Sequence, residues 1–97
     1  MSWTATLTWR VEIAEGAARQ IKKLGPSGAT RIRDYLRDRI APLQDPRQLG
    51  KPLRGSELGV FWRYRVGDYR ILCELRDDEL LVLVIAVGHR RSIYNRP

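Results

Sequence analysis

Three successive segments in the second half of the chain have the apolar patterns of strands, and this limits the fold more than any other feature. Every second side chain is apolar in residues 59–66 and again in residues 69–76, as expected for strands with one buried face. The two apolar sets are Val60, Trp62, Tyr64 and Val66, then Tyr69, Ile71, Cys73 and Leu75. Residues 80–87 are apolar without a break, which is typical of a central strand buried on both faces. Short turns at residues 67–68 and 77–79 predict antiparallel pairing in chain order.

The first half of the chain adds one strand and two helices. Residues 6–13 alternate strictly between apolar and polar side chains, which predicts a strand. Apolar spacings of three and four then predict amphipathic helices at residues 14–24 and 27–41. The breaker sequence at residues 25–28 makes the two a helical hairpin, and Pro42 ends the second helix. Residues 45–56 contain two prolines and two glycines and are expected to be irregular.

These elements predict an α+β fold in the order β-α-α-β-β-β. The length of 97 residues fits a single domain over residues 1–97. We expect the helical hairpin to pack on one face of a mainly antiparallel, twisted sheet. The opposite face of the sheet is then left open.

The charge of the chain points to a polyanionic partner. Lys and Arg number 18 against 11 Asp and Glu, which gives a formal net charge of +7. Only Lys22, Lys23 and Lys51 are lysines; the rest are arginines, whose planar guanidinium suits bidentate phosphate contact and base stacking. An arginine-rich codon usage would give the same bias. Nucleic acid, an anionic membrane and an acidic protein are the partner classes that fit this charge.

A membrane is the weakest of these three candidates. The apolar run at residues 80–87 is far shorter than the roughly 20 residues needed to span a bilayer, and the first residues lack a secretory signal pattern. Cys73 is the single cysteine, which excludes an internal disulfide and fits a reducing compartment. We therefore expect a cytoplasmic protein with no membrane contact, in which Cys73 is a small buried apolar residue.

Arginines recur on the polar side of the predicted strands. Arg63 and Arg65 share one strand face, and Arg70 can face the same way from the next strand. The end of the last strand and the tail add an imidazole, a guanidinium and a phenol, from His89, Arg90 and Tyr94. Any one of these arginines is more simply explained as solvating an exposed face. Their convergence with a titratable His and Tyr favours a functional surface.

Other site chemistries find little support in the residues. One His and one Cys cannot assemble the usual His/Cys zinc site, and no P-loop or GxGxxG pattern anchors a nucleotide, so we expect no metal and no cofactor. Ser56 and Ser92 lack the sequence context of a nucleophilic serine. Glu74 is the carboxylate expected on the arginine face, where an ion pair is its expected role.

Three phrases of the sequence carry a resemblance to a known family. They are GKPLRG at residues 50–55, WRYRVGDYRI at residues 62–71 and VGHRRSIY at residues 87–94. Together with an opening strand ending at Ile13 and a helix ending Lys22-Lys23-Leu24, they closely resemble the RelE/ParE toxin superfamily. The resemblance covers nearly the whole chain. The combination is specific, whereas each phrase alone is weak.

The resemblance implies a toxin of a type II toxin–antitoxin system with the same order of elements and a basic sheet face. RelE-type members cut messenger RNA in the ribosomal A site, whereas ParE-type members poison DNA gyrase and lack the nuclease residues. The tail at residues 87–94 is RelE-like, so we expect a metal-independent endoribonuclease. A ParE-type gyrase inhibitor is the alternative, and a member that binds RNA or an antitoxin without cutting is a third reading.

The resemblance also implies the site residues. The catalytic set carried over by motif is Arg63, Arg65, Arg70, His89, Arg90 and Tyr94, and the RNA-binding set is Lys51, Arg54, Arg63, Arg65 and Arg91. In these toxins the RNA 2′-oxygen attacks the neighbouring phosphate, which requires a base, an acid and positive charge around the transition state. RelE carries lysines where this chain has Arg63 and Arg65. Because arginine does not lose its proton, proton transfer falls to Tyr94 and His89, with Glu74 a distant candidate.

The partners implied by the resemblance are a cognate antitoxin, the ribosome and messenger RNA. The resemblance also implies that the toxin–antitoxin complex can bind operator DNA through the antitoxin. An acidic helical or extended segment of the antitoxin is expected to wrap the toxin at the helical hairpin and at the sheet edge.

Overall fold

The structure, a computed structural model, describes residues 9–53 and 60–89 of the chain. Its strands are β1 (Arg10–Ile13), β2 (Lys51–Pro52), β3 (Phe61–Val66), β4 (Tyr69–Arg76) and β5 (Leu81–His89). Its α-helices are α1 (Glu15–Lys23) and α2 (Gly25–Tyr35), and a π-helical turn at Leu36–Ile40 extends α2. Short 3-10 turns lie at Pro46–Gln48 and Asp77–Glu79.

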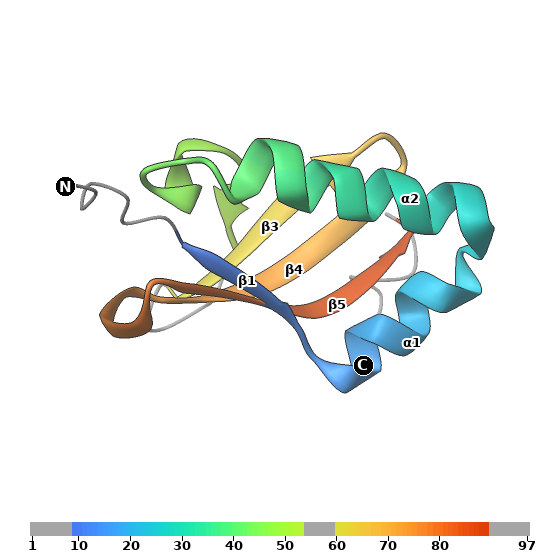
Figure 1. Ribbon diagram of the computed structural model, residues 1–97, viewed down its shortest axis with the longest axis horizontal. Helices are drawn as coiled ribbons and strands as arrows, with labels where there is room; N and C mark the ends of the chain where they lie inside the picture. The colour runs from blue at the N-terminus through green and yellow to red at the C-terminus, as the bar shows by residue number, and fades with distance from the viewer. Residues whose placement is uncertain (1–8, 54–59, 90–97) are drawn as a thin grey trace, which may run out of the picture.

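The strands form one sheet in the order β1-β5-β4-β3-β2 (Figure 1). β3, β4 and β5 pair antiparallel in chain order, as predicted, whereas β1 pairs parallel to β5. The predicted α+β class and the predicted order of elements are confirmed. The segment expected to be irregular differs in part, because Lys51 and Pro52 add a short antiparallel edge strand beside β3.

The helical hairpin packs on one face of the sheet, where α1 contacts β5 and α2 contacts β3 (Figure 1). The apolar sets predicted for β3 and β4 supply this core, in which Tyr64, Ile71 and Leu75 are fully buried. Cys73 is also fully buried, as predicted, and its burial raises the pKa of its thiol. The core therefore lies between the helices and one face of the sheet, and the other face carries the polar residues of the strands.

The turn of the helical hairpin is shorter than predicted. Only Leu24 separates the two helices, and Gly25, the first residue of α2, adopts a φ of +85° that favours glycine. Pro26 lies in the first turn of α2, where its missing N–H breaks no hydrogen bond. The helix ends before Pro42 as predicted, although its last turn is π-helical. None of the helices in the described ranges has the length and apolar character needed to cross a membrane.

β5 departs from the predicted pattern because it contains a β-bulge. The register with β4 shifts between Leu72 and Cys73, which pair with Ala86 and Val84. Ile85 is therefore the extra residue, and the alternation of side chains reverses after it. Val84 and Val87 are buried, whereas Ile85 and Ala86 are half-exposed. The prediction of a strand buried on both faces was thus wrong in part, since only the helix-facing side is fully covered over this stretch.

β1 is described from Arg10 onward, so the predicted strand residues 6–8 lie outside the described part of the chain. Trp9 is buried and Val11 packs against the core, in agreement with the predicted apolar face. Ile13 is 38% exposed although it belongs to the same set, because it ends the edge strand just before α1 begins.

Candidate nucleic-acid interface

Four basic residues meet on the open face of the sheet. The register places Arg65 opposite Arg70 and Lys51 opposite Arg63, and cross-strand partners project on the same side. The buried neighbours of these residues, Tyr64 and Ile71 among them, project on the helix side. Lys51, Arg63, Arg65 and Arg70 are called the basic patch below. The predicted convergence of Arg63, Arg65 and Arg70 on one surface is therefore present, and Lys51 of β2 joins them.

The basic patch juxtaposes like charges that a purely structural sheet would avoid. Opposite charges across a strand pair are stabilising, and like charges directly opposite each other are destabilising. Within residues 9–53 and 60–89, no carboxylate forms an ion pair with Lys51, Arg65 or Arg70. An anionic ligand with several phosphates would neutralise the charges of Arg65 and Arg70.

Arg65 and Arg70 of the basic patch lie at the end of the sheet nearest the β3–β4 turn, next to small residues of β5. Arg70 donates from Nη1 to the carbonyls of Gly67 at 3.0 Å and Tyr69 at 2.9 Å, so its guanidinium stays beside that turn. The β5 residues that pair with this part of β4 are Gly88 and Ala86. Neither residue has a large side chain, so β5 does not cover the neighbouring Arg70 on the open face.

The carboxylate of Glu74 lies further along the same face and is already paired. Arg76 donates to it at 3.0 Å, and Glu74 stands opposite Phe61 and Leu83 in the sheet. This ion pair is the role that the sequence predicted for Glu74. The open face therefore has a cationic end near the β3–β4 turn and a charge-paired end near the β4–β5 turn.

His89 lies away from the basic patch, contrary to the expected convergence. It pairs with Tyr69, on the side of β4 that carries Ile71 and Cys73, and the two rings are 5.1 Å apart. The bulge at Ile85 causes this placement, because strict alternation through β5 would have put His89 on the open face. The imidazole is exposed at the helix-facing end of the sheet, where Arg31 lies 6.0 Å over the Tyr69 ring.

Four predicted site residues fall in parts of the chain that the structure does not describe. These are Arg54, which was predicted to bind RNA, and Arg90, Arg91 and Tyr94 of the tail. They lie outside the described residues, so their roles stay predictions. His89, the last described residue, immediately precedes Arg90.

Two tyrosines of the described core are unsuited to proton transfer. Burial raises the pKa of Tyr64 and that of Tyr35 above the usual value for a phenol. Tyr64 donates its hydroxyl to the carbonyl of Pro46 at 2.9 Å. Both phenols therefore stay protonated near neutral pH. Tyr69 lies on the helix-facing side of β4 opposite His89, so none of the three tyrosines in the described residues projects into the basic patch.

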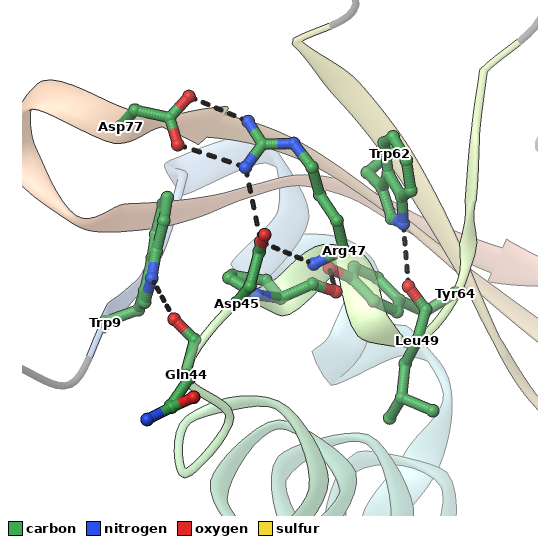
Figure 2. A network of polar contacts seen from close by, with 9 residues as sticks. Trp9, Gln44, Asp45, Arg47, Leu49, Trp62, Tyr64 and Asp77 are labelled. Carbon is green, nitrogen blue, oxygen red and sulfur yellow. Dashed lines mark hydrogen bonds and ion pairs between the residues drawn. The ribbon is translucent and has the colours of Figure 1, made fainter.

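Sequence reasoning assigned no role to residues 44–50, although they lead into the basic patch. Figure 2 shows this segment held by side chains from β3, from the β4–β5 turn and from Trp9. Arg47 makes a two-point ion pair with Asp77 at 2.8 and 3.0 Å, and Asp45 caps the same turn by accepting the Arg47 N–H at 3.0 Å. Pro46 and Gly50 were the only local signals, and they were interpreted as marks of irregular chain.

Comparison with known proteins finds relatives that match most of the chain. A family model described as the ParE toxin of type II toxin–antitoxin system, parDE, matches residues 11–94. Toxin RelG of Mycobacterium tuberculosis is 30% identical over 90 residues, which cover 93% of this chain and 100% of RelG.

Solved structures agree with these sequence matches. The toxin–antitoxin complex RelBE2 of Mycobacterium tuberculosis contains a chain with a TM-score of 0.75 and 28% identity, covering 88% of this chain and 94% of that one. The isolated RelE toxin of E. coli matches with a TM-score of 0.65 and 22% identity, covering 89% of this chain and 90% of that one. At 22% identity, the match to the E. coli toxin shows a shared fold.

Proposed function

Because this chain belongs to the RelE/ParE family of toxins of type II toxin–antitoxin systems, we propose that it is a ribosome-dependent endoribonuclease. Its substrate is messenger RNA in the ribosomal A site, and its reaction needs no metal. The proposal extends to a cytoplasmic site of action and to a cognate antitoxin as the partner that neutralises it. Operator DNA would be contacted by the toxin–antitoxin complex through the antitoxin.

The observation that carries the proposal is the gathering of Lys51, Arg63, Arg65 and Arg70 on the open face of the sheet. Arg65 stands opposite Arg70 on the open face, an arrangement that is unfavourable in the free protein and that a bound anion would relieve, and Lys51 and Arg63 add their charges beside it. Successive phosphates of a single RNA strand have the charge and spacing to lie along such a row. The net charge of +7 adds long-range attraction for RNA.

The chemistry that fits this surface is attack by a ribose 2′-oxygen on the adjacent phosphorus. The 2′-OH loses its proton, a bond forms from O2′ to phosphorus, and the bond to the 5′-oxygen of the next nucleotide breaks. The products are a 2′,3′-cyclic phosphate and a 5′-hydroxyl that takes up a proton. Arg63, Arg65 and Arg70 would stabilise the extra negative charge of the transition state, together with Arg90. Lys51, Arg54 and Arg91 would hold flanking phosphates.

We assign proton transfer to Tyr94 as the first candidate. His89 was the other candidate, but its position beside Tyr69 sets it apart from the basic patch. Tyr94→Phe should therefore lower the single-turnover cleavage rate by about 10²-fold or more, in line with the loss of a general acid or base. His89→Gln should retain most of the rate. The reverse ranking of the two variants would transfer the role to His89.

The test is primer extension on a defined message bound to ribosomes, with purified toxin freed of its antitoxin. Cleavage within the A-site codon is expected with the wild-type protein and only when ribosomes are present. Arg65→Ala should reduce cleavage by about 10²–10³-fold, because it removes one electrostatic contact to the transition state. Arg33→Ala, an exposed arginine of α2, is the matched control and should cleave normally. An intact message with folded wild-type protein would reject the proposal.

A gyrase inhibitor is the second candidate, and it is favoured by one observation. The family model that matches residues 11–94 is the one described for ParE. A non-catalytic inhibitor would act by binding protein, so cells expressing it would accumulate DNA breaks while their messages stayed whole. Truncated messages without DNA breaks are expected under the endoribonuclease proposal.

A further inference from the structure

Residues 44–50, called the strap below, bind the sheet through a regular set of hydrogen bonds. Three main-chain carbonyls of the strap accept from aromatic side chains (Figure 2). The pairs are Trp9 Nε1 to Gln44 O at 3.0 Å, Tyr64 Oη to Pro46 O at 2.9 Å, and Trp62 Nε1 to Leu49 O at 2.7 Å. The strap is thus held at its start, its middle and its end.

An ion pair adds a fourth attachment at the middle of the strap. Arg47 reaches Asp77 on the β4–β5 turn with both terminal nitrogens, and its guanidinium lies 6.0 Å over the ring of Trp9. Arg47 is well shielded and Asp77 is more exposed, with side-chain exposures of 28% and 67%. The attachment therefore joins the strap to the charge-paired end of the sheet, away from the basic patch.

The end of the strap approaches β3 very closely at Gly50. Gly50 has a φ of +73°, and a Cβ built on it would lie 2.4 Å from the carbonyl oxygen of Arg63. Only glycine fits this position, because both the backbone conformation and the space exclude a side chain. The next residue is Lys51, which pairs with Arg63 on the open face.

β2 by itself is a weak support for Lys51. It has two residues, and the second is Pro52, which has no N–H to donate to the sheet. On its C-terminal side β2 is held by the hydrogen bond from the Leu53 N–H to the Phe61 carbonyl at 3.0 Å. On its N-terminal side it is held by the hydrogen bond from Trp62 to the Leu49 carbonyl and by the close approach of Gly50 to β3, and these two set the position from which Lys51 enters the sheet.

We propose that Trp62 and Gly50 are positioning residues that fix Lys51 within the basic patch so that it contacts an RNA phosphate. The inference rests on the proposed function, since it assumes that the patch binds RNA. Neither residue touches the RNA in this account. The strap acts only through the place it gives to Lys51.

The test uses the salt dependence of binding to a short fluorescent single-stranded RNA, measured by anisotropy with the full-length protein. Each phosphate contact contributes about 0.7 to the slope of log affinity against log salt for a single strand. Lys51→Ala should lower the slope by about that amount. Trp62→Phe should give the same loss, and the double variant Trp62→Phe/Lys51→Ala should lose nothing further.

Trp9→Phe is the matched control. It removes the same kind of indole hydrogen bond from the same strap, but at Gln44, well before Lys51 in the chain. Both tryptophan variants should melt at lower temperature than the wild type, whereas only Trp62→Phe should change the slope. Gly50→Ala tests the second positioning residue where it folds, and Trp62→Leu, which also removes the indole N–H, keeps the test decisive if Trp62→Phe does not fold.

The outcomes separate the inference from the proposed function. A wild-type slope in Trp62→Phe or in folded Gly50→Ala, with a lowered slope in Lys51→Ala, overturns the positioning role alone. A lowered slope in Arg65→Ala with no change in Lys51→Ala also overturns it alone. If neither Lys51→Ala nor Arg65→Ala changes the slope, the basic patch does not hold RNA, and the proposed function fails as well.

Discussion

At the scale of single residues, the open face of the sheet places two arginines where their like charges oppose each other. Arg65 and Arg70 face each other across β3 and β4, where an aromatic or β-branched pair would bind the strands more firmly. Sequence alone predicted Arg63, Arg65 and Arg70 for this surface, because strand alternation fixes which residues share a face. It did not predict the place of His89, since the extra residue of a bulge leaves no mark in an apolar run such as residues 80–87.

Replacing one arginine of the patch should separate stability from activity. In Arg65→Thr a like-charge pair is lost and a β-branched residue enters the strand, so the free energy of unfolding should rise by about 0.2–1 kcal/mol. Message cleavage should fall by about 10²-fold or more in the same variant. Arg10→Thr is the control, because Arg10 lies on β1 in an ion pair with Glu12 and should bring no gain. Urea unfolding and ribosome cleavage assays on both variants check this, and a destabilised Arg65→Thr would contradict it.

The buried thiol and phenol make stability depend on alkaline pH. Burial raises the pKa of Cys73 and of Tyr64 in the folded state, so the folded protein keeps protons that the unfolded chain releases. Their contribution is fully present below the unfolded pKa values, about 8.5 for Cys and 10 for Tyr, and is lost as pH rises above them. The free energy of unfolding should therefore fall above about pH 9, by up to about 1.4 kcal/mol per pH unit for each group.

The variant Cys73→Ala/Tyr64→Phe isolates this pH effect. It lacks both titrating groups, so its stability should fall less steeply above about pH 9 than that of the wild type, even though its stability at neutral pH is lower. Urea titrations at a series of pH values give the two slopes. Equal slopes would show that the alkaline loss comes from other groups.

At the scale of elements, alternation and helical spacing predicted most of the fold, and short-range geometry accounts for the rest. β4 has the bounds predicted from its alternating residues, and the helical hairpin forms as expected. The sequence predicts irregular chain for residues 45–56 and does not reveal the strap or β2, because the strap is held by Trp9, Tyr64 and Trp62, which are distant in sequence. No local pattern signals contacts of that kind. The hairpin turn was placed too late because Pro26 was interpreted as a breaker, although it is compatible with a first helical turn.

The bulge in β5 can be tested by deleting one residue. Removing Ala86 leaves Ile85 as the single partner of Leu72, so the bulge is lost while Val84 stays opposite Cys73 and Val87 stays opposite Ile71. Because Val84 and Val87 keep their places in the core, the deletion should cost little stability. Val87→Ala removes the buried side chain itself and should lower the free energy of unfolding by about 2 kcal/mol. A loss in the Ala86 deletion as large as that in Val87→Ala, measured by thermal unfolding, would argue against this account of the bulge.

At the scale of the whole molecule, one sheet serves two purposes on its two faces. The helix-facing side holds the buried core, with Ile71, Val82 and Val84 at its centre. The open side holds the basic patch. The strap accepts hydrogen bonds from Tyr64 and Trp62 on the helix-facing side of β3 and then joins the edge strand β2, which supplies Lys51. An acidic antitoxin segment would oppose the net charge of +7 and so compete with RNA for the toxin.

The central claim is that the chain cuts messenger RNA by attack of a ribose 2′-oxygen. The most direct measurement compares two synthetic messages on programmed ribosomes, one all-ribose and one with a single 2′-deoxynucleotide on the 5′ side of the A-site scissile phosphate. Purified wild-type protein should cut the first and leave the second intact, because the nucleophile is missing. Cleavage of the deoxy message at the same phosphate, or no cleavage of either message by folded protein, would contradict the account.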